Sequence, residues 1–306
     1  MSVKCSRCNR PAFYYRPYSG EYLCKKCFPI TIKEKVRKTI SKYKMLEYGD
    51  KIGVAVSGGK DSLSLLKILT EISKGKGSEV IAITIDEGIK GYRDEALKLV
   101  RKVSKKLNVR YTVYSFKDLF GYTMDELVKI KSNISACAIC GVFRRRALDI
   151  AAMEEGVTVL ATAHNLDDTI QTFFINLFNV DLKRISWISP ISKPSNLFKI
   201  RRIHPMIELY EKEIALYAYL EGMPLQSTTC PYMEEGIRSE IRSYLNSMED
   251  RHPGIKYNIY YAALRIAERL KSEVKAVRCK LCGFPSINEV CQVCQLRSTI
   301  TKIKSF

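Results

Sequence analysis

The sequence predicts an α/β fold, a doubly wound parallel sheet with a small cysteine-bearing ribbon at each end of the chain. Through the middle of the chain, apolar runs of buried-strand type alternate with helical patterns, which is typical of parallel sheets covered by helices on both faces. Near each terminus, cysteines occur in pairs two residues apart, and such pairs indicate compact metal-bound modules. The 306 residues suffice for one large core with small appendages.

Eight cysteines form the terminal modules: Cys5, Cys8, Cys24 and Cys27 in the first, and Cys279, Cys282, Cys291 and Cys294 in the second. A two-residue gap lets one tight turn present both sulfurs to a single tetrahedral ion, so each set of four indicates a closed Zn²⁺ site. Two redox pairs are the rival interpretation, but these short charged segments cannot build the thioredoxin-like fold that such pairs need. The sequence therefore predicts two structural zinc ions.

Between the ribbons, the elements follow in order. A basic amphipathic stretch at 31–46 predicts a helix that links the first ribbon to the core. Strands and helices are then expected in strict alternation, beginning with a strand, at 52–56, 63–72, 80–85, 94–107, 110–116, 141–155 and 157–163. Further helices are expected at 208–220, 234–248 and 258–270. The spacing of Tyr257, Tyr260 and Tyr261 favours packing inside the protein over stacking on bases.

The first core strand runs directly into Ser57-Gly58-Gly59-Lys60-Asp61-Ser62, which in turn opens a helix. Because glycine has no Cβ, this turn can bring backbone N–H groups close to an oxyanion, and the helix that follows adds its positive dipole end. The Walker-type loop would need a glycine where Val54 stands and Ser or Thr where Asp61 stands. The segment therefore predicts a phosphate cradle of another kind.

Two more strand ends carry polar groups. Thr162 to Thr169 again joins a strand to a helix and contains the adjacent acids Asp167 and Asp168. Carboxylates in a first helical turn are good caps, but two of them beside a phosphate loop can also hold Mg²⁺, and Asp168 is the stronger candidate. Asp86 follows the second strand and is expected either to contact a nucleotide or to cap a turn.

The remaining cysteines are Cys137, Cys140 and Cys230, an odd number inside the predicted core domain. Three thiolates can hold three irons of a 4Fe-4S cluster and leave the fourth iron open for chemistry. Ordinary packing and a redox pair, with Cys140 and Cys230 closing into a disulfide, are the alternatives. The cluster is favoured because a two-cysteine mechanism leaves the third cysteine unexplained.

The chain is strongly basic, with 51 Lys and Arg against 32 Asp and Glu, a formal charge of +19. A generally basic thermophile surface is one explanation, but clusters at 144–146, 183–184 and 199–202 favour a large polyanionic partner. The sequence shows neither a secretory leader nor an apolar run long enough for a membrane span, so we expect a cytoplasmic protein without membrane contact. In that reducing compartment, metal sites are favoured over disulfides.

The run from Ser57 to Ser62 resembles the signature of the PP-loop ATP pyrophosphatase superfamily, also called adenine nucleotide α-hydrolase-like, whose members cleave ATP between the α and β phosphates. Together with His164 to Asp168, the three central cysteines and the two ribbons, it makes the whole chain similar to the tRNA 2-thiolation enzymes of the TtcA/TtuA family. The resemblance implies a sulfurtransferase that adenylates uridine O2 and replaces it with sulfur. The paired ribbons look more like those of the archaeal and eukaryotic branch, which favours uridine as the target. Within that branch we expect uridine 54 of the T-loop, with the wobble uridine 34 as the alternative.

The resemblance also implies which residues act. ATP and Mg²⁺ would be bound by Ala55, Ser57, Gly58, Gly59, Lys60, Asp61, Ser62, Ile85, Arg144, Ala163 and Asp168. The catalytic set would be Asp61, Arg144 and Asp168 with the cluster ligands Cys137, Cys140 and Cys230. Arg144 stands where relatives often carry lysine, and we expect it to act electrostatically. The implied partners are tRNA, a ubiquitin-like thiocarboxylate protein as sulfur donor, and a second copy of the chain in a homodimer.

The expected organisation is a zinc ribbon at 1–30, a linker helix at 31–49, an ATP-binding catalytic domain at 50–235, a helical segment at 236–275 and a second ribbon at 276–306. Two other classes of function stay open. A PP-loop ligase that adenylates a small molecule would explain the phosphate motif but neither the central cysteines nor the charge. An RNA-binding protein with a degenerate nucleotide site would leave the intact motif unexplained.

Overall fold

The computed structural model describes residues 3–75, 77–130, 134–192, 195–233, 236–271 and 276–304. Residues 234–235, where one predicted helix begins, and residue 275, at a predicted domain boundary, lie outside these ranges. The core is a sheet of five parallel strands in the order β5-β4-β3-β6-β7, as predicted for an α/β fold. Its strands are β3 (Lys51–Ala55), β4 (Glu79–Asp86), β5 (Arg110–Ser115), β6 (Val159–Ala161) and β7 (Arg201–Ile203).

Strand β7 was not predicted from the sequence. It has three residues, of which Arg201 and Arg202 belong to a run that reads as a basic surface cluster. The strand forms because it pairs with β6 in parallel register, with Val159 opposite Arg201 and Ala161 opposite Ile203. A strand this short has too little periodicity to be seen without its partner.

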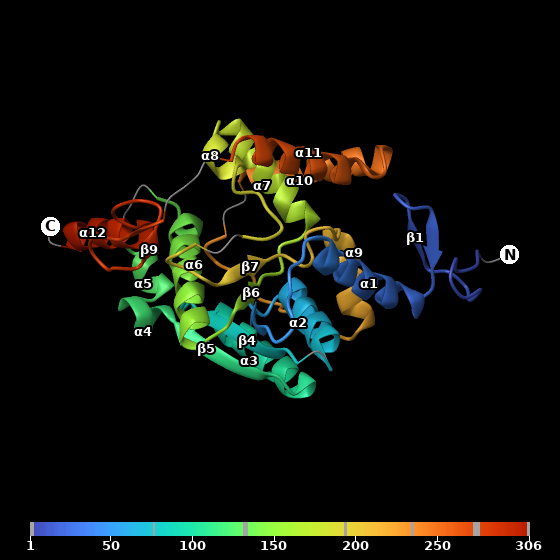
Figure 1. Cartoon of the computed structure of the whole chain (residues 1–306), viewed down its shortest axis with the longest axis horizontal. Helices are drawn as coiled ribbons and strands as arrows, with labels where there is room; N and C mark the ends of the chain where they lie inside the picture. Colours follow the sequence, from blue (N-terminus) through green and yellow to red (C-terminus); the bar gives the residue numbers. More distant parts are fainter. Residues whose placement is uncertain are drawn as a thin grey trace.

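Helices cover both faces of the sheet (Figure 1). On one face, α1 (Cys27–Lys42), α2 (Lys60–Ser73), α3 (Tyr92–Leu107) and α9 (Glu211–Leu220) enclose the largest apolar cluster with β3. On the other face, α6 (Ala136–Glu154) packs Ala151 and Ala152 against Ile81 and Ile83 of β4. Because both faces are covered, the central strands β3, β4 and β6 are largely buried and read as apolar runs.

Helix α6 begins five residues before the predicted start at residue 141. Ser135 caps it, since its side chain accepts a hydrogen bond from the amide of Ala138. This earlier start places Cys137 and Cys140 on the first turns of the helix. Two short helices, α4 (Phe116–Phe120) and α5 (Met124–Val128), lie between β5 and α6.

A second group of helices lies beyond the end of the sheet at the top of Figure 1. It contains α7 (Leu166–Phe178), α8 (Leu182–Ile185), α10 (Ile237–Arg251) and α11 (Ile255–Arg269). The bounds of α10 and α11 are shifted by a few residues from those predicted. Tyr260 is fully buried and the hydroxyl of Tyr257 donates to the carbonyl of Glu208, so the predicted packing role of the tyrosines is confirmed for these two residues.

The two ribbons lie at opposite ends of the molecule (Figure 1). The first contains β1 (Tyr14–Arg16) and β2 (Glu21–Leu23), and the second contains β8 (Val277–Arg278), β9 (Pro285–Ser286) and α12 (Gln292–Lys304). The first is fastened to the core by a buried ion pair in which Nε of Arg16 lies 2.6 Å from Oε1 of Glu213. The second packs against α6, with the guanidinium of Arg146 3.7 Å from the ring centre of Phe284.

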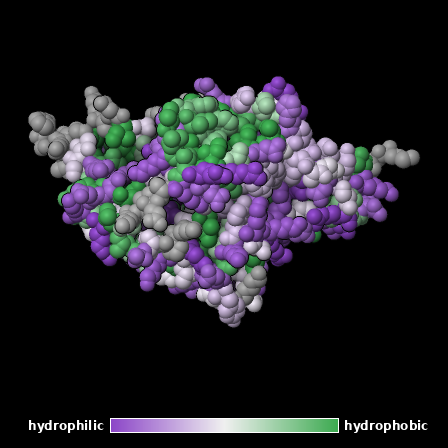
Figure 2. Space-filling model, turned by 45° about the horizontal axis from the view of Figure 1, so that its top comes forward, coloured by the Kyte–Doolittle hydropathy of each residue, from purple (hydrophilic) through white to green (hydrophobic). Residues whose placement is uncertain are grey.

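Most of the visible surface is polar, but Figure 2 shows a hydrophobic area on the side of the second helix group. Exposed apolar side chains from this part of the chain are Leu177, Phe178, Val180, Leu182 and Trp187. No helix among the described residues has the length and apolar character needed to cross a membrane.

Candidate active site

The predicted site residues lie at the point in the sheet where the order of the strands reverses. Strand β3 pairs with β4 on one side and with β6 on the other, so the chain moves outward to β5 and then returns across β3. Open α/β sheets bind ligands in the crevice at such a point, outside the carboxyl ends of the strands. The phosphate loop follows β3, and the segment from Thr162 to Asp168 follows β6.

The phosphate loop requires glycine at its tightest point. Gly58 has φ of +96°, and a Cβ at this position would lie 2.8 Å from Cβ of Ala96 on α3. Ser62 braces the turn: its hydroxyl accepts a hydrogen bond of 3.2 Å from the amide of Ser57 and donates one of 3.0 Å to the carbonyl of Gly59. Helix α2 starts after Gly59 without a side-chain cap, so its first amides are available to an anion.

Charged groups of both signs surround this loop. Nζ of Lys60 lies 3.2 Å from Oδ1 of Asp61 and 3.2 Å from Oε1 of Glu211 on α9. Burial raises the pKa of Asp61 to about 6, and the negative charges of Glu211 and Asp168 act in the same direction, against Lys60. Carboxylate oxygens beside a phosphate cradle are the kind of donor that suits Mg²⁺.

The two adjacent acids after β6 have different environments. Asp167 is 4 % exposed, forms an ion pair with Lys256 of α11, and accepts a hydrogen bond of 2.7 Å from the amide of Glu211. Asp168 is half-buried and shares a capping box with Asn165, whose Oδ1 accepts a 2.9 Å hydrogen bond from the Asp168 amide. Asp167 therefore holds the helices together, while Asp168 both caps α7 and lies near enough to Asp61 to affect its pKa.

Three further predicted residues lie at the same edge of the sheet. Ala55 ends β3, Ile85 is the penultimate residue of β4, and Ala163 follows β6. The side chain of Ile85 belongs to an apolar core cluster and its carbonyl accepts a hydrogen bond from Arg93, so only its place in the sheet fits the predicted nucleotide contact. Asp86 caps a turn, because its Oδ1 accepts a 2.9 Å hydrogen bond from the amide of Gly88.

The three central cysteines come from two segments. Cys137 is exposed and Cys140 buried on the first turns of α6, and Cys230 lies in the loop after α9. Burial raises the pKa of the Cys140 thiol to about 11, and the negative charges of Glu87, Cys230 and Cys137 act in the same direction. The guanidinium of Arg144 opposes this shift and donates a hydrogen bond of 3.2 Å from Nη2 to Sγ of Cys140.

The central sulfurs are spaced more widely than the terminal ones. In the part of the chain that the structure describes, only the two terminal quartets have ligand atoms that all lie within 4.8 Å of one another. This spacing suits a single ion in each quartet, whereas a cluster of four irons and four sulfides is wider than one ion. In the second quartet, the amide of Cys291 donates to Sγ of Cys279 at 3.3 Å and lowers the pKa of that thiol to about 6. Such amide contacts favour the thiolate that a zinc site needs.

Four residues that the sequence analysis missed support the site. Glu95 on α3 accepts hydrogen bonds from the amides of Ser227 and Thr228, at 2.8 and 2.9 Å, and so fixes the loop that carries Cys230. Glu211 adds a carboxylate beside Lys60. Glu87 and Arg93 are buried between the phosphate loop and the cysteines. The sequence places these charges in helical or turn segments where exposed acids and bases are common, so nothing marked them as functional.

Basic residues that are distant in sequence meet beside the site. Partial burial of Arg145 and the positive charges of Arg202, Arg184 and Arg144 lower the pKa of the Arg145 guanidinium. Nη2 of Arg202 also donates to the carbonyl of Arg145 at 3.4 Å. Such an accumulation of positive charge favours the binding of phosphates.

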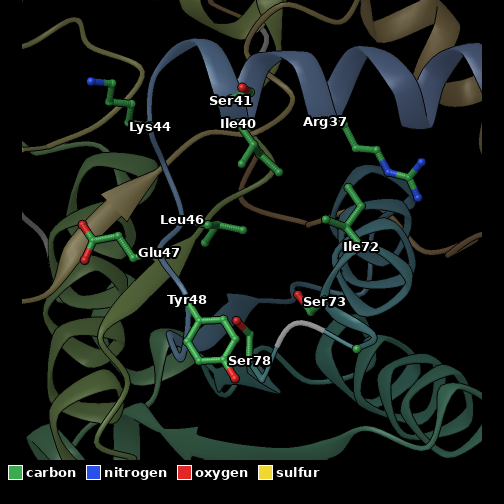
Figure 3. A pocket seen from close by; sticks show the side chains of 11 residues that line it. Arg37, Ile40, Ser41, Lys44, Leu46, Glu47, Tyr48, Ile72, Ser73 and Ser78 are labelled. Carbon is green, nitrogen blue, oxygen red and sulfur yellow. The ribbon is translucent and has the colours of Figure 1, made fainter.

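A cavity of about 720 Å³ lies at the opposite end of the strands. It is lined by the last turns of α1 and α2 and by the segments that precede β3 and β4 (Figure 3). Ile40, Leu46 and Ile72 point into its centre, whereas Arg37 and Lys44 extend away from it. Because nucleotides bind at the carboxyl ends of such strands, this cavity is not the nucleotide site.

The sequence of this chain is similar to those of known proteins. Residues 30–247 match the PP-loop domain family, and residues 4–29 match the N-terminal LIM domain of 2-thiouridine synthetase TtuA. A probable sulfurtransferase of Methanocaldococcus jannaschii is 35 % identical over 98 % of this chain and 89 % of its own length. Cytoplasmic tRNA 2-thiolation protein 1 of Drosophila ananassae is 35 % identical over 97 % of this chain and 88 % of its own length.

A solved structure is similar over nearly the whole chain. It is the U34-tRNA thiolase NcsA from Methanococcus maripaludis with its 4Fe-4S cluster. The two chains are 34 % identical, and the superposition covers 98 % of this chain and 97 % of that one with a TM-score of 0.86. The whole architecture, ribbons included, is therefore shared.

Proposed function

Because the chain belongs to the PP-loop family of tRNA 2-thiolation enzymes and is a tRNA sulfurtransferase, we propose that it converts uridine 34 of tRNA to 2-thiouridine. The observation that carries the proposal is that the phosphate loop and the cysteine site are connected by side-chain contacts. A continuous set of contacts runs from the Ser57 carbonyl in the phosphate loop through Arg93, Glu87 and Arg144 to Cys140.

Position 34 is preferred to position 54 because of the solved relative. The protein named a U34-tRNA thiolase is similar over almost the entire chain, whereas the match to the TtuA module covers residues 4–29. A small ribbon far from the crevice cannot by itself select the uridine. The sequence-based expectation of position 54 is therefore replaced by position 34 in this proposal.

ATP would bind with its phosphates at the loop from Ser57 to Ser62. The glycine turn brings amides to the phosphates, Lys60 adds a positive charge, and Asp61 with Asp168 would hold Mg²⁺. Support for this arrangement comes from the uncapped start of α2 and from the crowding of carboxylates around Lys60. Ala55, Ile85 and Ala163 line the same edge, where adenine and ribose would lie.

A 4Fe-4S cluster would be held by Cys137, Cys140 and Cys230. The residues suit such a cluster in their chemistry. Three sulfurs come from the start of a helix and from a fixed loop, and they are spaced more widely than the ligands of a single ion. A guanidinium lies beside one of them. When bound, such a cluster supplies an iron without a protein ligand that can carry the incoming sulfur. The terminal quartets would each hold a structural Zn²⁺.

The protein's own residues would then act on the uridine. The loop holds ATP so that uridine O2 can bond to the α-phosphorus while the bond to the leaving pyrophosphate breaks. Arg144 keeps 45 % of its side chain exposed, so it can neutralise charge on the phosphoryl oxygens as well as contact Cys140. Sulfur then bonds to uridine C2 and the C2–O2 bond breaks, so that AMP leaves with the oxygen.

The partners are also part of the proposal. The arginine surface formed by Arg144, Arg145, Arg184 and Arg202 lies beside the crevice and would bind the tRNA backbone. A ubiquitin-like thiocarboxylate protein would supply sulfur, and the reaction would take place in the cytoplasm. A homodimer would cover the exposed apolar surface at Phe178, Val180 and Trp187.

The deciding experiment is the modified-nucleoside analysis of individual tRNAs. Purified protein, ATP, sulfide and an unmodified tRNA should yield 2-thiouridine that maps to position 34. Transcripts carrying cytidine at position 34 or at position 54 serve as the matched pair, and only the first should lose the product. Thiolation that persists without uridine 34 but fails without uridine 54 would return the assignment to the T-loop.

A further inference from the structure

A buried carboxylate lies between the phosphate loop and the cysteine site. Glu87 follows β4 and is 3 % exposed. Its Oε2 lies 2.7 Å from Nε of Arg93, and its Oε1 accepts a hydrogen bond of 2.6 Å from Nε of Arg144. Each carboxylate oxygen thus faces a different guanidinium.

The two arginines reach opposite sites. Arg93 on α3 donates 2.7 Å and 2.5 Å hydrogen bonds to the carbonyls of Ser57 and Ile85, at the start of the phosphate loop and the end of β4. Arg144 on α6 donates to Sγ of Cys140. Three side chains therefore connect the nucleotide side of the crevice to the cysteine side without a gap.

The backbone at Glu87 and Gly88 is fixed against the start of α5. Gly88 has φ of +68°, and a Cβ there would lie 2.6 Å from Cβ of Thr123, so the chain passes too close for any other residue. The carbonyl of Glu87 accepts a 2.7 Å hydrogen bond from the amide of Met124. A carboxylate held this firmly defines where both guanidinium groups lie.

The charges explain why the link depends on Glu87. Arg93 is also only 3 % exposed, so its buried guanidinium needs the carboxylate of Glu87 as a counter-charge, and the same carboxylate holds the half-exposed Arg144 nearby. Neutralising the carboxylate would leave Arg93 and Arg144 to repel each other, and both would leave their present hydrogen bonds. A displacement of the groups at one end of this set of contacts therefore changes the position of the groups at the other end.

We propose that Glu87 is a positioning residue that couples the nucleotide site to the cysteine site, by holding Arg93 against Ser57 and Arg144 against Cys140. This inference rests on the proposed function, because it takes ATP to bind at the loop and a cluster to bind at the cysteines. Its consequence is that nucleotide binding changes the environment of the cluster, and loss of Glu87 separates the two sites.

The test uses anaerobically prepared, cluster-loaded protein and a non-hydrolysable ATP analogue. In the wild type, the analogue should change the electron paramagnetic resonance spectrum of the reduced cluster. In Glu87→Gln, this response should disappear and the analogue should bind about tenfold more weakly, equivalent to about 1.4 kcal/mol. The matched control is Glu155→Gln, which removes a carboxylate paired with Arg110 at the other end of α6 and should keep the wild-type response.

A second variant guards against a loss of stability in Glu87→Gln. Arg93→Lys keeps the charge, but a single ammonium group cannot reach Ser57, Ile85 and Glu87 together, so the variant should alter the cluster spectrum from the nucleotide side. If both variants retain the full nucleotide response, or if the wild type shows none while binding its cluster, the coupling is wrong and the thiolation function stands. An active wild-type protein without iron would instead contradict the proposed function.

Discussion

Asp167 of α7 forms a buried ion pair with Lys256 of α11, and this contact separates the roles of two acids that are adjacent in sequence. Lys256 is 3 % exposed and also donates a 2.6 Å hydrogen bond to Oδ1 of Asn246 on α10. The carboxylate of Asp167 is thereby committed to helix packing beside the crevice. Asp168, one residue later, keeps its carboxylate on the side of Asp61.

We therefore expect the neutral variants of the two acids to differ. Asp167→Asn should lower the free energy of unfolding by about 3 kcal/mol, because it leaves the ammonium group of Lys256 buried without a counter-charge. Asp168→Asn should retain most of the stability but lose ATP-dependent pyrophosphate release. Denaturant unfolding and a pyrophosphate assay measure the two effects. Equal loss of stability in both variants would contradict this division.

Asp61 should make stability depend on pH. Its folded-state pKa is raised to about 6 by burial, above the ordinary value of 3.8, so the folded protein holds the proton more tightly than the unfolded chain. The stabilisation from the protonated carboxyl is fully present below about pH 3.8 and is lost as the pH rises through about 6. Asp61→Asn should therefore raise the melting temperature more at pH 7.5 than at pH 5, without nucleotide or Mg²⁺. An equal gain at both pH values would show that burial of the charge is not the cause.

Metal content should distinguish the three cysteine groups. Anaerobically prepared protein should be brown and contain about four irons and two zincs. Cys140→Ser should abolish the iron absorbance and leave both zincs, whereas Cys8→Ser should remove one zinc and leave the iron. Elemental analysis of the same samples measures both metals. Full iron in Cys140→Ser would exclude this cysteine as a ligand, and a fully active iron-free protein would favour a disulfide relay.

Binding of tRNA should depend on the arginine surface and on salt. If Arg145 and Arg184 each contact a phosphate, their change to Gln should lower the salt dependence of tRNA binding by about one released ion per residue. Affinity for ATP should stay unchanged, since neither residue lies at the phosphate loop. Lys33→Gln is the control, because Lys33 lies on α1 and pairs with Glu71. An unchanged salt dependence would place the RNA on another surface.

Point variants are preferable to deletion of the second ribbon. Cys279, Val293 and Ile300 from this ribbon belong to the same apolar cluster as Cys140 and Phe143 of α6. Its removal would expose the helix that carries the cysteines, so a loss of activity would not separate RNA binding from stability. The ribbon is a small module in sequence, but its inner face is part of the core.

Local patterns were enough for the features that depend on neighbouring residues. The turn through Gly58, the cysteine pairs of the ribbons and the alternation of strands and helices each need only a few consecutive positions, because backbone freedom, thiolate spacing and periodicity act locally. These features predicted the parallel sheet, the tight turn of the phosphate loop and the two cysteine quartets, whose sulfurs lie close enough together to hold a metal ion. The position of Asp168 at a helix start was predictable for the same reason.

Tertiary structure alone decided what depends on contacts between distant segments. The short strand β7 exists because β6 pairs with it, and Asp167 is removed from the crevice because Lys256, 89 residues later, reaches it. Glu87 acquires its place because α3 and α6 bring Arg93 and Arg144 to opposite sides of one carboxylate. A charged residue in a sequence carries no sign of its burial or its partner, since both are set by how the helices pack on the sheet.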